Sequence, residues 1–218
     1  NEKTMSNGIS MNRGSKMAYI RNLNKKSAKD NNTNYSIVID SEVYFNSNII
    51  DKMIKSINKN NKIAMITPFN ICYETYSYQK HPIHYYDSLA FITNDNLSHK
   101  QTANTCLFDI CYKCINHRKI YNVNINKNKL LSVKKNIKVN SAFGGFVLLK
   151  SDIFNKVKWG NTICEHHYFC EMVRNLGYNI IVNPKIITTT NAIDNKPVNN
   201  NLIKKILQID FTKDNLHI

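Results

Sequence analysis

The sequence predicts an α/β protein whose sheet contains parallel strands. Two short β-branched runs, at residues 35–40 and 62–67, have the character of buried strands. Between them, apolar residues recur at helical spacing, so this part of the chain alternates strand, helix and strand. Such an alternation is typical of sheets with parallel strands.

The first half of the chain supplies the elements of this unit. A helix is predicted over residues 13–29, with an irregular apolar face. Asn46 or Ser47 is expected to cap the next helix. Its apolar face is made by five residues: Ile49, Ile50, Met53, Ile54 and Ile57. The strand that follows is expected to end at Pro68.

The second half is predicted to add one more helix before the chain returns to the sheet. That helix covers residues 103–117. A glycine pair at 144–145 then forms a loop that feeds a strand, as expected where the backbone approaches a ligand or another backbone closely. A helix over about 164–176 follows, with Gly177 as its C-terminal cap.

The C-terminal part of the chain differs in composition from the preceding domain. A strand at 178–182 is expected to stop at Pro184, and Thr and Asn become abundant after it. A short amphipathic helix near 202–208 closes the chain. Residues 1–190 are therefore assigned to one domain, and residues 191–218 to a C-terminal tail.

Charge and composition limit the function classes. A hydrophobic content of 42% can supply a core, which argues against wholesale disorder. The chain has 30 Lys and Arg against 15 Asp and Glu, a net charge of +15. These lysines are interleaved with abundant Asn and cluster only in pairs, so they favour anionic substrates such as nucleotide phosphates without defining a nucleic-acid module. No apolar stretch reaches the roughly 20 residues that cross a membrane.

The six cysteines predict buried thiols. Cys106, Cys111, Cys114 and His117 form a cluster that suggests zinc, but its spacing lacks the two separated pairs of common structural zinc sites. The same stretch is predicted to be helical, and cysteine packs there as a small hydrophobe. Irregular cysteine spacing is also consistent with a reducing compartment.

Asp40 and Glu42 follow the first predicted strand and are the candidate metal ligands. In an extended chain, residues two apart point to the same side, so both carboxylates can converge on one object. Open α/β sheets bind ligands at the carboxyl ends of their strands, and hard divalent cations prefer oxygen ligands. An ordinary surface turn after a strand is the alternative.

Several segments, taken in order, resemble a known family. They are Arg13-x7-Arg21-Asn22, Asp40-Ser41-Glu42, Ser141-Ala142-Phe143-Gly144-Gly145, and Cys164-Glu165-His166 followed by Gly177 and Asn183-Pro184. Over about residues 13–187 they resemble nucleotide-sugar glycosyltransferases of the GT-A fold, in particular viral and microbial members that decorate capsids, capsules and surface glycans. Tyr85-Tyr86-Asp87-Ser88 is similar to a Tyr-Asp-Ser/Thr segment of capsule-type mannosyltransferases.

The resemblance implies a Rossmann-like mixed sheet flanked by helices and a metal-dependent, inverting hexosyltransferase. Mn²⁺ or Mg²⁺ held by Asp40 and Glu42 would neutralise the leaving nucleotide diphosphate as a Lewis acid. Glu165 occupies the place where inverting members carry an acidic residue at a helix start, and there it would deprotonate the acceptor hydroxyl. The alternative for Glu165 is a favourable charge at a helix N-terminus.

The resemblance also implies donor-binding and acceptor-binding residues. The donor set is Arg13, Arg21, Asn22, Gly144 and Gly145, and the acceptor set is Asp87 and His166. The two arginines project within about 80° of each other and would add positive charge near the phosphates. A solvated helix face for the arginines, a plain tight turn for the glycines and a structural loop role for Asp87 remain the alternatives.

Two departures from the family are visible. GT-A domains open with a β-α-β unit, upstream of the Arg-Asn helix, that supplies much of the nucleotide pocket. Only about a dozen residues precede Arg13 here, so the chain is expected to be a fragment without that unit. The second departure is Glu42 at the last position of the Asp-x-Asp motif, which keeps the charge and lengthens the side chain by one methylene.

Two other functions stay open beside the transferase. One is a non-catalytic remnant of the fold that binds glycan or protein. The other is a basic nucleic-acid-binding domain, although no aromatic-basic motif of a known module is present. The expected partners are a nucleotide-sugar donor and a glycan or glycoprotein acceptor, with no nucleic acid. The expected location is the cytoplasm, that of the host or a viral factory if the protein is viral, with the Golgi lumen as the alternative.

Overall fold

The fold is known from a computed structural model. It describes residues 13–28, 32–73, 84–85, 90–94, 136–160, 164–191 and 200–208. The helices are α1 (Arg13–Ala28), α2 (Ile49–Asn58), α5 (Ser151–Lys156), α6 (Glu165–Asn175) and α7 (Asn200–Leu207). The strands are β1 (Tyr35–Ile39), β2 (Val43–Tyr44), β3 (Ile63–Tyr73), β4 (His84–Tyr85), β5 (Ile92–Thr93), β6 (Ile137–Ser141), β7 (Phe146–Lys150) and β8 (Asn179–Asn191).

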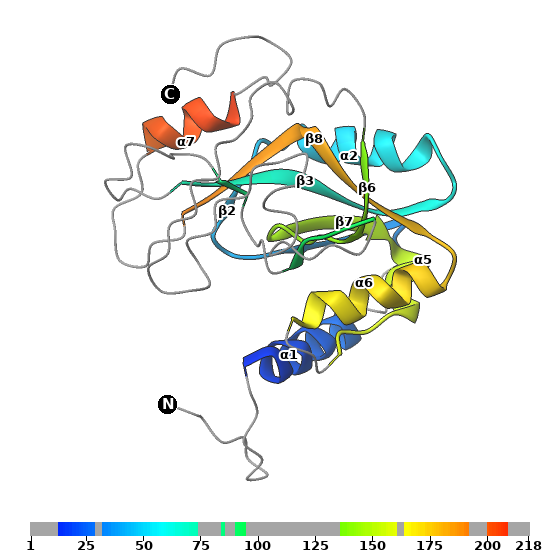
Figure 1. Cartoon of the computed structure of the whole chain (residues 1–218). Coiled ribbons are helices and arrows are strands. Elements are labelled where there is room, and N and C mark those ends of the chain that lie inside the picture. The colour runs from blue at the N-terminus through cyan, green and yellow to red at the C-terminus, as the bar shows by residue number, and fades with distance from the viewer. Residues whose placement is uncertain are drawn as a thin grey trace.

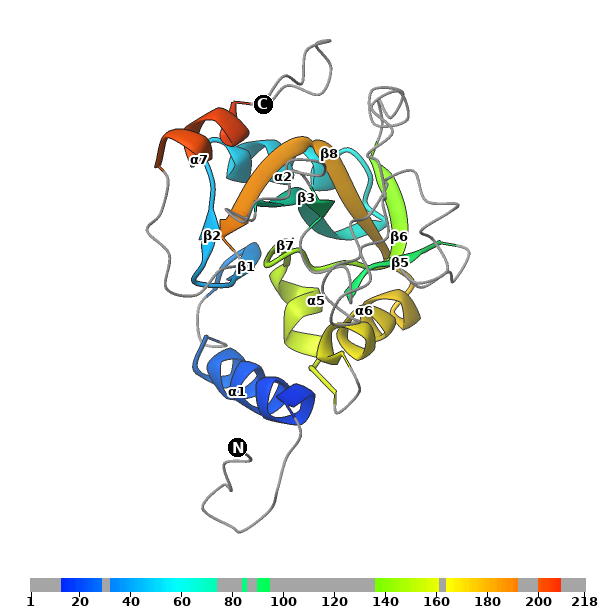
Figure 2. The same cartoon turned by 60° about the vertical axis from the view of Figure 1, so that its left-hand side comes forward.

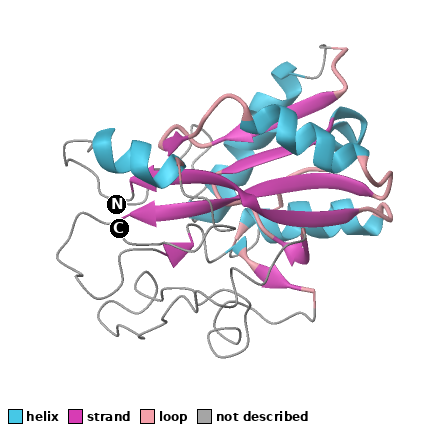
Figure 3. Cartoon of the chain, turned by 90° about the horizontal axis from the view of Figure 1, so that it is seen from above, coloured by secondary structure: helices cyan, strands magenta, loops and turns pink. Residues whose placement is uncertain are grey.

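The protein is α/β, with one mixed sheet flanked by helices. In the described part of the chain the sheet has eight strands, whose main path runs β1-β7-β3-β8-β6-β5. β3 and β8 are long and parallel, whereas β6 is antiparallel to β8. Figure 3 shows these long central strands side by side, with helices lying against them. The α/β class predicted from the sequence is confirmed.

The predicted strand–helix–strand unit forms, but another strand lies inside it. β1 and β3 are each antiparallel to β7, which separates them in the sheet. They therefore run in the same direction, as the alternation predicted. β7 comes from the second half of the chain, so the first half does not close its sheet by itself.

β1 is an edge strand, and the prediction that it is buried was wrong. It pairs only with β7 among the described strands. The side chains of Ile37 and Ile39 are 42% and 41% exposed. They alternate with Val38, which packs against the core, because successive side chains of a strand point to opposite faces.

Two long strands pass through the prolines that were expected to end them. β3 continues beyond Pro68, and β8 continues beyond Pro184. The register of the β3–β8 pair shifts at this place, where Pro68 is opposite Asn183 and Phe69 is opposite Ile187. A bulge of this kind accommodates proline within a sheet because it removes the need for a ladder bond.

Helices cover both faces of the sheet. α2 lies on one face, and α1, α5 and α6 lie on the other (Figure 1). Met53 and Ile57 of α2 are fully buried, as the predicted apolar face requires, and pack with Ile66 of β3. On the opposite face, Phe169 and Val173 of α6 pack in a second cluster.

The start of α2 differs from the sequence prediction. Asn48 is its N-terminal cap residue and makes no side-chain capping bond. Asn46 and Ser47 contribute instead through their backbone carbonyls, which accept bonds from the amides of Ile49 and Ile50. The end of α6 agrees with the prediction, since Gly177 has a φ of 85° and follows the helix directly.

The C-terminal helix belongs to the same core. α7 packs against β8, and its Ile203 is buried in the cluster that contains Phe169. Among the described helices, none combines the length and the apolar character that a membrane crossing requires.

Candidate functional site

Arg21 lies at the centre of the candidate site, between two acidic segments. Its Nη2 donates to Oδ1 of Asp40 at 3.1 Å. Its Nε lies 3.5 Å from Oε1 of Glu165, close enough for an ion pair but without hydrogen-bond geometry. Asp40 follows β1 and Glu165 is the first residue of α6. The guanidinium therefore joins the end of a strand to the start of a helix.

The helix that carries Arg21 is fixed against the loop before α6 by the neighbouring residue. Nδ2 of Asn22 donates to the carbonyl of Trp159 at 2.8 Å, and the Trp159 amide donates to Oδ1 of Asn22 at 3.0 Å. Lys25, one turn further, donates to the carbonyls of Asn155 and Val157 at the end of α5. Positive charge at a helix C-terminus is stabilising.

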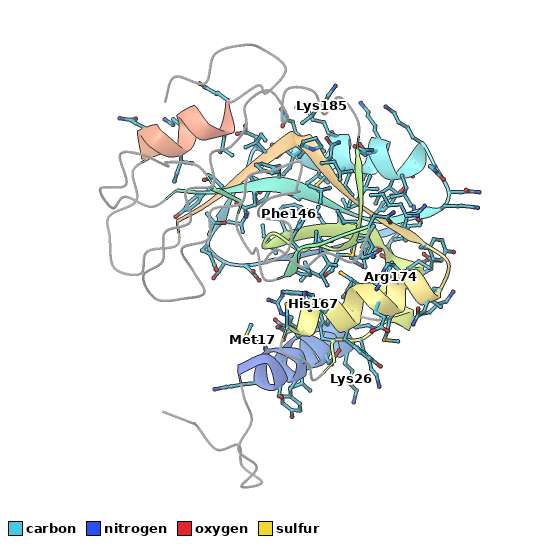
Figure 4. All side chains as sticks on the ribbon, in the orientation of Figure 1. Met17, Lys26, Phe146, His167, Arg174 and Lys185 are labelled. Carbon is cyan, nitrogen blue, oxygen red and sulfur yellow. The ribbon has the colours of Figure 1, made fainter. Side chains whose placement is uncertain are left out.

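Figures 2 and 4 show how these elements meet. α1 lies outermost on its face of the molecule (Figure 2). It is adjacent to α6, and the labelled His167 of α6 and Met17 of α1 lie at the end where the two helices approach (Figure 4). The site is thus built at a junction between α1, α6 and the end of β1.

Asp40 is partly buried beside one positive and two negative side chains. Burial raises the pKa of its carboxyl above the ordinary value. The guanidinium of Arg21 opposes this shift, whereas the charges of Glu42 and Glu165 add to it. Two carboxylates, those of Asp40 and Glu165, thus face one guanidinium, and the charge of Glu42 acts on Asp40 without contacting Arg21 in the described structure.

Asp40 and Glu42 are not presented by an extended chain, as the sequence argument assumed. The Val43 amide donates to the Asp40 carbonyl at 3.2 Å and closes a turn. Glu42 is exposed, and its Oε2 accepts a bond from the Ser41 hydroxyl at 3.3 Å. The side chain of Asp40 is 22% exposed and faces Arg21. The two carboxylates are close enough to influence each other, but only one lies inside the cluster.

The glycine pair forms the wall beside Asp40. Gly144 and Gly145 have φ values of 62° and 69°, a conformation that side chains other than glycine rarely adopt. The carbonyl of Gly145 accepts the Asp40 amide at 2.8 Å. The carbonyl of Gly144 accepts Nδ2 of Asn70 at 2.6 Å, and Asn70 also bonds Thr190 of β8. The turn is therefore held in place from β1, β3 and β8.

His166 is buried directly behind Glu165. Its ring stacks on Phe143, with centroids 3.7 Å apart and planes 18° apart. Nε1 of Trp159 donates to its Nδ1 at 3.4 Å, and its Nε2 lies 3.5 Å from Oε1 of Glu165. Burial, together with the nearby Arg21 and His167, holds the pKa of His166 well below its usual range. The imidazole is therefore neutral at pH 7.

The acidic cluster fits a divalent cation by charge but supplies few protein ligands. Within the described ranges, no group of three or more His, Cys, Asp and Glu side chains gathers to hold a metal ion. Asp40 and Glu42 are two carboxylates with mutual repulsion, which a cation would relieve. Magnesium typically keeps several waters and takes one or two carboxylates plus phosphate oxygens from its substrate.

Some predicted residues cannot be placed. Asp87 and the Cys106–His117 cluster lie outside the described residues. Arg13 begins α1, but its side chain is not among those described. Of the predicted site residues, the structure brings together Arg21, Asp40, Glu165 and His166. Asn22, Gly144 and Gly145 border them through the contacts given above.

Sequence reasoning missed Trp159 and Asn70, which both act on the site through hydrogen bonds. Trp159 is the single tryptophan of the chain and is followed by Gly160. A Cβ atom on Gly160 would lie 2.4 Å from the ring of Tyr168, so only glycine lets this loop lie on α6. For Trp159, the sequence feature that could have indicated its role is a single tryptophan next to a glycine. For Asn70, the feature is a polar residue inside an otherwise apolar strand.

The chain was also compared with known proteins. No protein-family model matches the sequence, and no curated protein matches it significantly.

Proposed function

We propose that this chain is the catalytic domain of a metal-dependent glycosyltransferase of the GT-A type. It would transfer a hexose from a nucleotide-diphosphate sugar to a glycan or protein acceptor. One observation carries the proposal. Asp40 and Glu165, from distant parts of the sequence, share the guanidinium of Arg21 where β1 ends and α6 begins, and the exposed Glu42 is close enough to raise the pKa of Asp40.

The cluster contains groups suited to both halves of such a reaction. Asp40 and Glu42 would hold Mn²⁺ or Mg²⁺, and a bound cation supplies Lewis-acid stabilisation of a diphosphate leaving group. Glu165 would accept the proton of the acceptor hydroxyl as its oxygen bonds to the anomeric carbon and the bond to the diphosphate breaks. Attack from the face opposite the leaving group gives inversion.

Arg21 has a role in this proposal that differs from direct phosphate binding. Its guanidinium already faces two carboxylates, Asp40 and Glu165. It opposes the rise that burial causes in the pKa of Asp40, because a nearby positive charge favours the charged form of the carboxyl. When a cation binds Asp40, Arg21 becomes free to interact with the phosphates of the donor.

The edge strand β1 supports the finer GT-A assignment, because it pairs with β7 alone among the described strands. Its Ile37 and Ile39 are exposed, and so are Tyr19, Ile20 and Leu23 of α1. Large exposed apolar side chains on an edge strand suit a contact surface. We propose that a further β-α-β unit, as the resemblance implies, pairs with β1 and completes the nucleotide pocket.

In the same proposal the protein works in the cytoplasm, where thiols such as those of Cys164 and Cys170 stay reduced.

The direct test is release of nucleoside diphosphate from a panel of nucleotide sugars by the chain together with that further β-α-β unit, with Mn²⁺ or with chelator. We expect Mn²⁺-dependent hydrolysis of one donor, lost in Asp40→Asn and in Glu165→Gln. Asp51→Asn and Glu171→Gln change exposed acids on α2 and α6 and serve as matched controls.

The other outcomes separate the rival functions. If no donor is hydrolysed but a glycan array binds, the chain is a non-catalytic relative. If the chain binds DNA or RNA with an affinity that falls steeply with salt, a nucleic-acid role replaces the transferase.

A further inference from the structure

The hydrogen bonds of His166 define which of its nitrogens carries the proton. The indole N–H of Trp159 can only donate, so Nδ1 of His166 must be the acceptor of the 3.4 Å bond. A neutral imidazole has a single proton, which then sits on Nε2. That nitrogen lies 3.5 Å from Oε1 of Glu165, within electrostatic reach of the carboxylate but without the geometry of a hydrogen bond.

Both protein contacts of the Glu165 carboxylate fall on the same oxygen. Nε of Arg21 and Nε2 of His166 are each 3.5 Å from Oε1. Oε2 has no hydrogen-bond or ion-pair partner among the described residues. The carboxylate is therefore anchored on one side, and its second oxygen is the one available to a bound molecule.

His166 itself is badly placed to contact a substrate. It is 5% exposed, one face of its ring lies on Phe143, and both nitrogens face protein groups. This burial does not suit the acceptor-binding role expected from the sequence. It suits a side chain that acts through its neighbour.

We propose that His166 is a positioning residue that, as the Nε2–H tautomer imposed by Trp159, orients Glu165 so that Oε2 receives the proton of the acceptor hydroxyl. The proposal rests on the proposed function and names the arrangement within that site. The hydrogen bond from Trp159 fixes the tautomer of His166, and stacking on Phe143 fixes the plane of its ring. The Nε2 atom of His166 is thereby held 3.5 Å from Oε1 of Glu165.

The tautomer can be measured without any substrate. Imidazole ¹⁵N NMR of the labelled protein, assigned by comparison with His166→Phe, is expected to show one Nε2–H form for His166. Trp159→Phe removes the donor to Nδ1 and should give a mixture of tautomers. Glu165→Gln should shift the Nε2–H resonance, because the acceptor changes from a carboxylate to an amide.

The kinetic arm tests positioning directly. His166→Phe keeps an aromatic ring on Phe143 but removes the N–H, and we expect kcat for transfer to fall about tenfold or more with the donor KM unchanged. His166→Gln, which can place an amide N–H near the position of Nε2, should recover part of that loss. Urea unfolding of each variant separates loss of rate from loss of fold.

The two proposals fail in different ways. An Nδ1–H tautomer in an active enzyme, or a folded His166→Phe variant with wild-type kcat, overturns the positioning role and leaves the transferase. Absence of turnover by the wild type with every donor and acceptor overturns the transferase and the catalytic part of this inference together.

Discussion

Arg21 illustrates what a single residue gains from its fold. Its position on one face of a helix follows from helical periodicity, which is a property of the local sequence. Its partners, Asp40 and Glu165, come from two other elements and have no fixed spacing from it. The family resemblance named the arginine as a site candidate and periodicity placed it on a helix face, but neither could show that carboxylates rather than phosphates surround it.

Replacement of Arg21 by Met should destabilise the protein. The aliphatic part of the side chain is retained, but Asp40 and Glu165 lose their shared cation in a place where their side chains are 22% and 12% exposed. We expect the free energy of unfolding at pH 7 to fall by about 2–3 kcal/mol, measured by urea denaturation. Lys26→Met, an exposed change on the same helix, should have little effect. Equal stability of both variants would contradict a stabilising role of the ion pairs.

His166 predicts how stability depends on pH. Its pKa is lowered in the folded protein, so below the ordinary pKa of about 6.5 the unfolded chain binds the proton more readily. Above pH 6.5 this residue makes its full contribution to the free energy of unfolding. As the pH falls below that value, the contribution decreases by at most about 1.4 kcal/mol per pH unit.

The comparison with His166→Phe isolates this effect. Chemical denaturation between pH 7 and pH 5 should give a steeper loss of stability for the wild type than for the variant. Identical slopes would mean that folding leaves the pKa of His166 unchanged.

At the scale of elements, four of the five described helices and four of the eight described strands were predicted, and the errors have specific causes. The apolar face of α2 was identified correctly because helical spacing survives in the sequence whatever the helix packs against. The strand ends predicted at Pro68 and Pro184 were wrong because both prolines lie at the register shift between β3 and β8. This shift arises only when the two strands pair, so the sequence of either strand alone does not reveal it.

The link between α1 and the loop before α6 can be tested at Asn22. Asn22→Ala leaves the amide and the carbonyl of Trp159 without their partner, so we expect unfolding free energy to fall by about 2 kcal/mol. Trp159 is the single tryptophan, and its fluorescence should shift to longer wavelength as the loop loosens. Asn24→Ala, an exposed change on the same helix, is the matched control. Unchanged emission in a destabilised Asn22→Ala variant would place the effect elsewhere.

At the scale of the whole molecule, a chain with a net charge of +15 concentrates negative charge at one place. Asp40 and Glu165 lie on either side of Arg21, and the charge of Glu42 also reaches Asp40. Composition revealed the basic character, whereas the acidic cluster arises only when distant segments fold together. A small acidic site on a basic protein suits a cation that accompanies an anionic substrate.

Manganese should stabilise the whole fold if the cluster binds it. A ligand that binds only the folded state adds about 2.7 kcal/mol at a hundred times its dissociation constant. We expect the melting temperature to rise with Mn²⁺ concentration for the wild type and for Asp51→Asn. The rise should be absent in the double variant Asp40→Asn/Glu42→Gln. A rise of equal size in that double variant would place the metal at another site.

The position of β7 between β1 and β3 has a consequence for the order of folding. The two strands are neighbours along the chain, yet their place in one sheet depends on residues 146–150. During synthesis, the turn that carries Asp40 and Glu42 is therefore made long before the strand that fixes it. Contacts between segments so far apart close slowly, because chain entropy must be lost before they form. The candidate site should be among the last parts of the nascent protein to acquire its shape.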